Sequence, residues 1–151
     1  MLSIGDKAPE FALPDSNSSS VRLKDFRGKN VVLYFYPRDL TPGCTKEACS
    51  FNDALASLRK QGAVVLGVSA DSVESHRKFA EKYGLRFPLL SDPERDVIKA
   101  YGAWQKKSMY GRSFMGIVRT TFVIDAKGRI RAIFPKVRVE GHAEEILKSL
   151  E

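Results

Sequence analysis

Two cysteines, Cys44 and Cys49, are the residues of this 151-residue chain whose type and spacing point most directly to chemistry. The chain has no other cysteine. Structural disulfides are rare in a reducing compartment, so two cysteines there serve redox chemistry, metal binding or burial in the core. A cysteine reacts as its thiolate, so the surroundings of each sulfur decide among these roles.

The segment before Cys44 predicts that this sulfur lies in the first turn of a helix. Thr41 precedes Pro42, so its backbone is biased toward an extended conformation. Threonine is a good N-cap, and proline is favoured at the first helical position. Cys44 is then the third helical residue, where unpaired N–H groups and the helix dipole favour an anion. A thiolate is therefore favoured there over a thiol.

The helix terminus alone is too weak to ionise a cysteine. A thiol with the ordinary pKa of about 8.5 is only roughly 3% ionised at pH 7, and lowering that pKa to about 6 requires roughly 3.4 kcal/mol. The helix terminus supplies at most about 2 kcal/mol. A nearby cation is needed, and Arg119, directly before a predicted strand, is the candidate. We expect Arg119, the Thr41 hydroxyl and the backbone N–H groups of Gly43 and Cys44 to direct donors at one substrate oxygen. Glu47 is expected to bond a group at the helix start, to pair with Arg119, or to be solvated.

The five-residue spacing restricts how Cys49 and Cys44 interact. In an intact helix, five residues place the two Cα atoms roughly 8.7 Å apart, whereas a disulfide needs less than about 7 Å. Either the two cysteines never pair, or the first turns of the helix unwind when they do. Unwinding would be a redox-driven conformational switch.

Spacing alone leaves other interpretations open. Cys44 falls on an apolar stripe, where an inert buried cysteine is common, and Cys49 is open to the same interpretation. A zinc site formed by both cysteines with His76 and His142 is disfavoured, because the cysteines have four intervening residues and the histidines are isolated. The two histidines are expected to be surface or packing residues. Arg119, taken alone, is typical of a surface arginine.

The elements that position these residues follow an α/β pattern. The hydrophobic periodicity and the turn residues predict the following order. It begins with a hairpin around a loop at 15–20, a buried strand at 31–36 ended by Pro37, and a helix whose apolar stripe runs from Cys44 to Leu58. A strand at 63–68, a helix between Ser72 and Gly84, a helix between Asp92 and Gly102, strands at 120–124 and 129–134, and a helix at 143–150 follow. This order predicts a thioredoxin-like α/β fold, with a mixed central sheet, helices on both faces and an N-terminal β-hairpin.

Composition limits the class of protein. The length and the 43% hydrophobic content are typical of one globular domain, spanning 1–151. No apolar run reaches the roughly 18 residues of a membrane-spanning helix, and the first residues do not resemble a signal peptide, so we expect a cytoplasmic protein without a membrane contact. The net charge of +7 comes from dispersed basic residues without clustered aromatics, which argues against nucleic-acid binding. The densest basic stretch is Lys127, Arg129, Arg131, Lys136 and Arg138.

Segment 34–49 resembles the active-site segment of the peroxiredoxins. Their Pro-x-x-x-Thr-x-x-Cys pattern is matched by Pro37, Thr41 and Cys44. A second cysteine five residues later is typical of the Q-type branch, also called bacterioferritin comigratory protein. The resemblance extends to residues 5–11, 67–72, 87–92, 119–122 and 141–145.

This resemblance implies a function and a role for each site residue. Cys44 would be the peroxidatic cysteine, Thr41 and Arg119 its activating partners, Pro37 its shield and Cys49 the resolving cysteine. The family reduces hydrogen peroxide and organic hydroperoxides through a sulfenic acid and, in this branch, an intramolecular disulfide. Thioredoxin or a similar dithiol protein is the reductant, and no metal, haem or flavin is used. Such an enzyme serves antioxidant defence and redox homeostasis, and its Q-type relatives are often monomers.

Three rival functions remain to be distinguished. A general thiol–disulfide oxidoreductase on the same fold would normally show Cys-x-x-Cys, which is absent here. A nucleic-acid-binding module would bind in a salt-dependent manner. A holdase chaperone has no supporting feature in the sequence.

Overall fold

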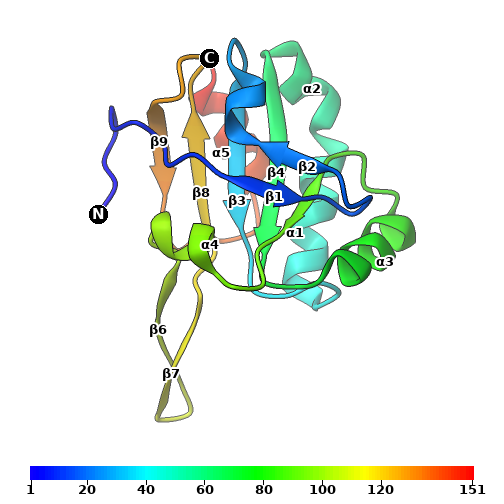
Figure 1. The fold of residues 1–151 in the computed structure, drawn as a ribbon, viewed down its shortest axis with the longest axis vertical. Helices are drawn as coiled ribbons and strands as arrows, with labels where there is room; N and C mark the ends of the chain where they lie inside the picture. Colours follow the sequence, from blue (N-terminus) through cyan, green and yellow to red (C-terminus); the bar gives the residue numbers. More distant parts are fainter.

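A five-stranded central sheet organises the structure, a computed structural model that describes all of residues 1–151 (Figure 1). Its strand order is β5-β4-β3-β8-β9. The strands are β3 (Asn30–Phe35), β4 (Ala63–Ser69), β5 (Leu89–Ser91), β8 (Thr120–Ile124) and β9 (Ile130–Phe134). Strands β3, β4 and β5 are parallel, whereas β8 is antiparallel to both β3 and β9. The predicted mixed sheet is therefore confirmed.

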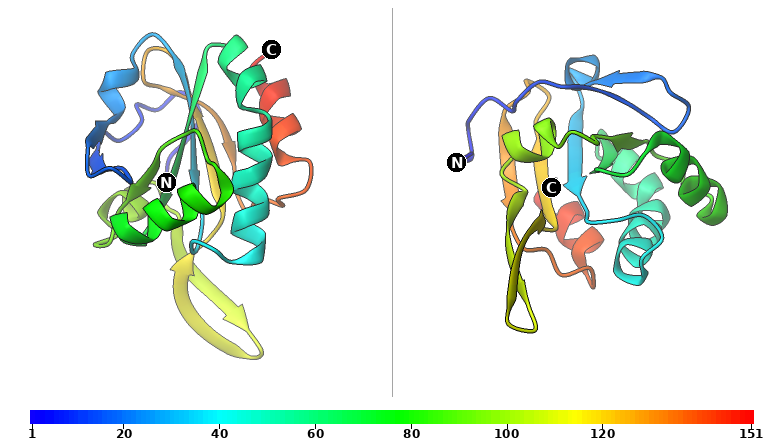
Figure 2. Two further views of the ribbon diagram at one scale, coloured as in Figure 1. Left: turned by 90° about the vertical axis from the view of Figure 1, so that its right-hand side faces the viewer. Right: turned by 60° about the horizontal axis from the view of Figure 1, so that its bottom comes forward.

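Helices cover both faces of this sheet, as predicted (Figure 2). Helices α1 (Pro42–Asp53), α2 (Leu55–Lys60) and α5 (His142–Ser149) lie on one face. The short helix α4 (Asp96–Ala100) and the N-terminal segment lie on the other, and α3 (Val73–Tyr83) flanks the edge formed by β5. None of these helices has the length and apolar character needed to cross a membrane.

The N-terminal segment forms the expected hairpin. Strands β1 (Ala12–Pro14) and β2 (Ser20–Arg22) pair antiparallel around the polar loop, and a 3-10 helix, η1 (Leu23–Phe26), follows. Leu13 and Leu23 are buried against the sheet face opposite to α1.

Strand β3 separates two hydrophobic cores. Because successive side chains of a strand point to opposite faces, Leu33 and Phe35 join the core under the N-terminal hairpin. Val32 and Tyr34 join the core under α1 and α5. All six residues at 31–36 are buried, which confirms the strand predicted from this continuous apolar run.

The helix that follows β3 keeps its predicted apolar stripe but is divided in two. The stripe is confirmed, since Cys44, Ala48, Phe51, Leu55 and Leu58 are all buried. The helix breaks at the residue between Asp53 and Leu55, where the backbone has φ −86° and ψ −1°. The apolar period continues across the break and so does not reveal it.

The predicted start of the helix between Asp92 and Gly102 is wrong, because α4 begins only at Asp96. Residue Arg95 has φ 66°, a left-handed conformation that interrupts a right-handed helix. Asp92 lies outside α4, and its carboxylate accepts a hydrogen bond from the Ile98 backbone N–H at 2.8 Å. The short strand β5, just before this turn, was also missed.

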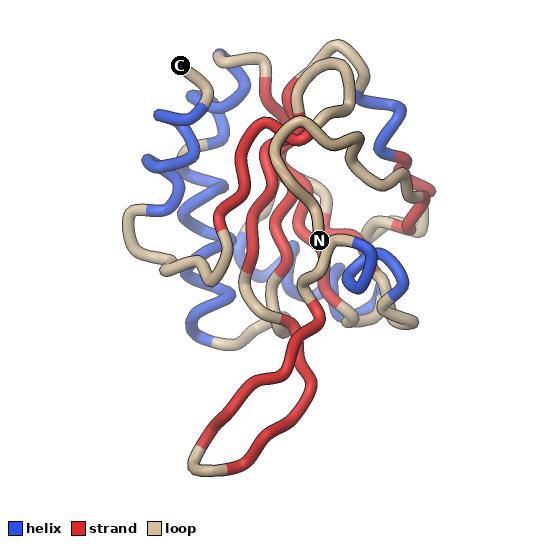
Figure 3. The backbone as a smooth tube through the Cα atoms, turned by 90° about the vertical axis from the view of Figure 1, so that its left-hand side faces the viewer, coloured by secondary structure: helices blue, strands red, loops and turns tan.

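A second hairpin, β6 (Trp104–Met109) and β7 (Arg112–Ile117), was not predicted. It projects from the body of the molecule below the sheet (Figure 3). Tyr110 and Gly111 at its tip have φ 53° and 76°, the positive pair that a tight hairpin turn requires. Interspersed lysine, arginine and serine residues obscure the alternation of apolar residues, so the only local signal was the Tyr-Gly turn.

Candidate functional site

The candidate site lies where the carboxyl end of β3 meets the start of β8. In the antiparallel pairing, Phe35 lies opposite Thr120, so Arg119 faces the loop that leaves β3. That loop begins with the half-buried Pro37 and leads into α1. Ligand sites on sheets of this kind lie beyond the carboxyl ends of strands, and the pairing places Arg119 next to one.

Cys44 occupies the position expected from the sequence. Thr41 is the N-cap of α1 with an extended backbone (φ −79°, ψ 154°), Pro42 is the first helical residue and Cys44 the third. The cysteine is 2% exposed, and the Nη2 atom of Arg119 lies 3.5 Å from its Sγ atom. The sulfur therefore lies at the start of the helix with a guanidinium at hydrogen-bonding distance.

The Thr41 hydroxyl differs from the expectation. It donates its single proton to the Arg38 carbonyl at 2.9 Å, and it makes no capping hydrogen bond to the first turn of α1. A hydroxyl carries only one donor, so in this conformation Thr41 cannot also donate to a substrate oxygen. The donors that remain directed at the site are the Arg119 guanidinium and the N–H groups of the first helical turn, including those of Gly43 and Cys44.

Glycine at position 43 permits the close approach of the guanidinium. A Cβ atom at Gly43 would lie 3.2 Å from Nη2 of Arg119, which is tighter than an ordinary van der Waals contact. Because no side chain stands there, the charged group can lie against the start of α1.

Glu47 fixes the other end of the Arg119 guanidinium. Its Oε1 atom accepts from Nη1 of Arg119 at 2.6 Å, while its Oε2 atom is buried without a partner. Burial raises the pKa of Glu47 to about 7, although the Arg119 charge acts in the opposite direction. Burial would lower the pKa of Arg119, but the neighbouring charges of Glu47 and Cys44 raise it above its ordinary value. Arg119 therefore stays charged, and Glu47 exchanges its proton near neutral pH.

This carboxyl group predicts a pH-dependent stability that Glu47→Gln should remove. The folded protein holds the Glu47 proton up to a pKa of about 7, whereas the unfolded chain releases it near 4.5. The stabilisation is therefore complete below about pH 4.5 and is lost as pH rises through about 7. Relative to Glu47→Gln, the parent protein should lose at most about 3 kcal/mol of unfolding free energy across that range.

Urea unfolding at a series of pH values, under reducing conditions, measures this difference. Burial lowers the pKa of His142, which gives the opposite pH dependence, but His142 contributes equally to both proteins and cancels. A difference between the two proteins that stays constant with pH would contradict the assignment.

Cys49 lies half-buried in α1, five residues after Cys44, and both cysteines are free. Burial, with a smaller contribution from the Asp53 carboxylate, raises the pKa of the Cys49 thiol. Because α1 is continuous through both cysteines, their Cα atoms have the separation of an intact helix, roughly 8.7 Å. The two sulfur atoms cannot bond until part of α1 unwinds.

The two histidines are buried packing residues rather than surface residues. His142 Nε2 lies 2.8 Å from Thr121 Oγ1, and its Nδ1 lies 2.9 Å from Glu145 Oε1. His76 belongs to a different cluster, in which its Nδ1 lies 2.7 Å from Asp39 Oδ2. Neither histidine contributes to a cluster with the cysteines.

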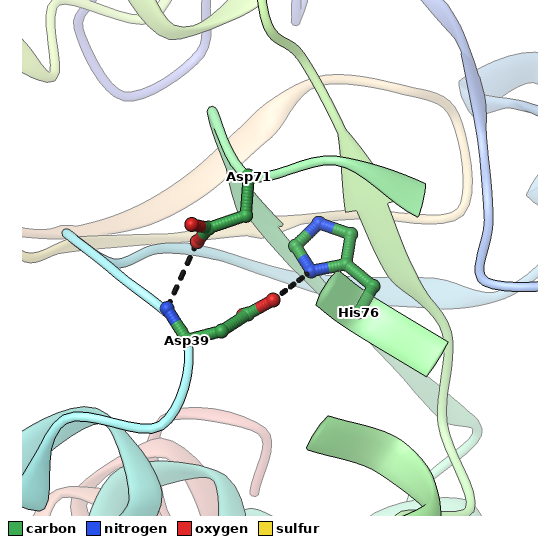
Figure 4. Close-up of side chains that lie close together, drawn as sticks. All are labelled: Asp39, Asp71 and His76. Atoms are coloured by element: carbon green, nitrogen blue, oxygen red, sulfur yellow. Dashed lines mark hydrogen bonds and ion pairs between the residues drawn. The ribbon is translucent and has the colours of Figure 1, made fainter. Parts of the chain in front are cut away.

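The cluster of Asp39, Asp71 and His76 was not predicted from the sequence (Figure 4). It is the only set of three possible metal ligands whose donor atoms lie close together, within 4.8 Å of one another. The available signal was the histidine itself, placed among Val73, Phe79 and other inward-facing residues of α3.

Known proteins resemble this chain over nearly its full length. A family model described as the AhpC/TSA family matches residues 4–133. A putative peroxiredoxin bcp of Coxiella burnetii is 50% identical over 149 residues, covering 99% of each chain. The peroxiredoxin Bcp of Bacillus subtilis is 46% identical over 150 residues, covering 99% of this chain and 96% of the relative.

Solved structures agree with these sequence matches. A cysteine-to-serine mutant of PrxQ from Xylella fastidiosa has a TM-score of 0.94 and 41% identity, covering 99% of this chain and 96% of that chain. The bacterioferritin comigratory protein of Xanthomonas campestris, studied for alkyl peroxide reduction activity, has a TM-score of 0.91 and 39% identity, with the same coverage. The predicted thioredoxin-like fold is thus confirmed as the peroxiredoxin fold. The chain belongs to the AhpC/TSA family and is a peroxiredoxin of the Bcp/PrxQ type, an enzyme that reduces peroxides with a cysteine thiol.

Proposed function

We propose that Cys44 is the peroxidatic cysteine and that Arg119 activates both the sulfur and the peroxide. The observation that carries this assignment is the 3.5 Å contact between Nη2 of Arg119 and Sγ of Cys44 at the first turn of α1. The same guanidinium and the first-turn N–H groups face the region where a peroxide oxygen would lie beside the sulfur. They would stabilise the negative charge that develops as the O–O bond breaks.

In the first step, the Cys44 thiolate attacks the terminal oxygen of the hydroperoxide. A sulfur–oxygen bond forms, the O–O bond breaks, and the sulfur loses two electrons to give a sulfenic acid. The second oxygen leaves with that electron pair and takes a proton, as water or as an alcohol. We assign to Pro37, which is half-buried at the start of this loop, the role of shielding the sulfur, and Thr41 shapes the loop through its hydrogen bond to the Arg38 carbonyl.

In the second step, Cys49 resolves the sulfenic acid. The start of α1 unwinds, the Cys49 sulfur attacks the Cys44 sulfur, and a disulfide forms as the S–O bond breaks. The departing oxygen takes the Cys49 proton and leaves as water. Thioredoxin or a similar dithiol protein then reduces the disulfide by thiol exchange and itself becomes oxidised.

The substrate class is hydrogen peroxide and organic hydroperoxides. The Xanthomonas relative studied for alkyl peroxide reduction supports the organic part of this range. We place the enzyme in the cytoplasm, because a disulfide that must be reduced in every cycle needs a reducing compartment. It would act there as a monomer, with residues 1–151 as one domain, in antioxidant defence and redox homeostasis.

Mass spectrometry after one equivalent of peroxide tests the cycle. The reduced protein should lose two hydrogens in mass, and digestion should yield one peptide pair linked through Cys44 and Cys49. An untreated sample that has been alkylated and digested provides the control. Peroxide-treated protein that carries only sulfinic or sulfonic acid on Cys44, with Cys49 still free, would exclude the resolving step.

Cys49→Ser is expected to separate the two steps. The variant should consume about one equivalent of peroxide, because the Cys44 thiolate and Arg119 remain in place. It should then stall as the sulfenic acid or become over-oxidised, since no thiol is available in the chain to displace the oxygen. Steady turnover of this variant with a thioredoxin system, measured by peroxide consumption, would show that Cys49 is dispensable.

A further inference from the structure

A buried acid–histidine pair joins the loop before α1 to helix α3 (Figure 4). Asp39 lies in the loop and is 6% exposed, and His76 of α3 is completely buried. Oδ2 of Asp39 lies 2.7 Å from Nδ1 of His76 and accepts from Oγ of Ser75 at 2.8 Å. Oδ1 of Asp39 accepts from the Tyr36 hydroxyl at 2.6 Å.

Both ring nitrogens of His76 have hydrogen-bond partners. Its Nε2 atom lies 3.0 Å from the carbonyl oxygen of Leu90, which can only accept, so Nε2 carries a proton. Its Nδ1 atom faces a carboxylate whose other neighbours, Ser75 and Tyr36, both donate hydroxyl protons. The Asp39–His76 contact is therefore one hydrogen bond of a buried network in which every polar side-chain atom of both residues has a partner.

A second contact fixes the backbone of the same loop residue. The Asp39 N–H donates to Oδ2 of Asp71 at 2.8 Å, and that oxygen also accepts from Ser69 Oγ at 2.7 Å. Asp39 is thus held through its side chain by α3 and through its backbone by the loop after β4. No member of this network hydrogen-bonds to Cys44 or Arg119.

The residue after Asp39 is strained. Leu40 is exposed and has φ 64°, a left-handed conformation that is unfavourable for a side chain branched beyond Cβ. Leu40 therefore connects Asp39, which is held by hydrogen bonds, to Thr41, the N-cap of α1. The backbone of this connecting residue is strained. The hydrogen bonds on Asp39 oppose any movement of the helix start that extends upstream of Leu40.

We propose that Asp39 and His76 are positioning residues that hold the start of α1 in its peroxide-reactive conformation and set the upstream limit of the segment that unwinds. This inference rests on the proposed function, because it assigns a place to the unwinding that a Cys44–Cys49 disulfide requires. Weakening the pair shifts the balance from the folded conformation, which reacts with peroxide, toward the unwound conformation, in which the disulfide forms.

Quenched-flow mixing of the reduced protein with peroxide, followed by thiol blocking and mass spectrometry, measures both steps. The rise of sulfenic acid gives the first rate constant, and its conversion to the disulfide gives the second. In His76→Phe, we expect the first rate constant to fall and the second to rise, so that the ratio of the second to the first increases by about fivefold to tenfold, as for loss of one buried hydrogen bond. Hydrogen exchange in the reduced variant should increase at the amides of 40–48 more than in the sheet.

His142→Phe is the matched control, since it removes another buried, doubly hydrogen-bonded histidine from a different helix. It should leave the ratio of the two rate constants within about twofold of the parent value. Changes at independent sites typically alter each other's free energies by no more than this. Asp39→Asn is the second test variant, in case His76→Phe does not fold. It keeps the shape of the Asp39 side chain but replaces one acceptor oxygen with an amide NH2 group, and it should shift the ratio in the same direction by a smaller factor.

The outcomes separate this inference from the proposed function. If the parent protein forms no Cys44–Cys49 disulfide, both are overturned. If the parent forms the disulfide, but the folded variants of Asp39 and His76 keep the parent ratio, only this inference is overturned. It is also overturned if His142→Phe changes the ratio as much as they do, because the effect would then follow general destabilisation.

Discussion

Cys44→Ser is expected to abolish peroxide consumption. A serine hydroxyl stays protonated at neutral pH beside Arg119 and cannot take up the peroxide oxygen as sulfur does. Removal of an enzyme's nucleophile lowers turnover by about 10⁴-fold or more. The measurement is steady-state peroxide consumption with a thioredoxin system, and no burst of consumption should precede it.

Cys49→Ser serves as the companion of this variant, because both replace one sulfur in the same helix. The first equivalent of peroxide should be consumed by Cys49→Ser and not by Cys44→Ser. If Cys44→Ser kept full turnover, or if the two variants exchanged these properties, the assignment of the peroxidatic sulfur would be wrong.

Arg119→Met should have the second-largest effect. It removes the cation 3.5 Å from the sulfur and one donor to the reacting oxygen, while a long apolar side chain fills part of the space. Loss of one such donor in a buried site typically costs about 10²–10³-fold in rate. The second-order rate constant of the reduced protein with hydrogen peroxide should fall by that factor.

The fold should survive this change, because Glu47 does not become a buried unpaired charge. Its pKa is already about 7 with Arg119 present, so without the guanidinium it holds its proton at neutral pH. Arg119→Lys should show an intermediate rate, since it keeps the charge but loses the two-pronged contact to Cys44 and Glu47. A thermal melt confirms folding, and a rate for Arg119→Met within threefold of the parent would contradict the proposed role.

The parts of the site that depend on local sequence were predictable. Pro42 and the residue before it set the start of α1, and the spacing of apolar residues placed Cys44 on its buried face. Ser72 and Gly84 likewise mark the two ends of α3, where the serine accepts from the Ser75 N–H and the glycine has φ 60°. Each of these features is determined by residues within one or two helical turns.

The parts that depend on contacts between distant segments were only partly predictable. Arg119 was expected near Cys44 because a cation was needed, but the register between β3 and β8 that brings it there is a long-range pairing. The direction of the Thr41 hydroxyl depends on the path of the loop back to Arg38. The hydrogen bond between Asp39 and His76 joins residues 37 positions apart, and no local pattern in the sequence predicts it.

Because α1 contains both sulfur atoms, the intact helix and the disulfide exclude each other. Reduction of the disulfide therefore restores the hydrogen bonds of the helix. The free energy of that refolding adds to the driving force of electron transfer and raises the reduction potential of the bond, at about 30 mV for each 1.4 kcal/mol. A mildly reducing dithiol is then sufficient to return the enzyme to its active state.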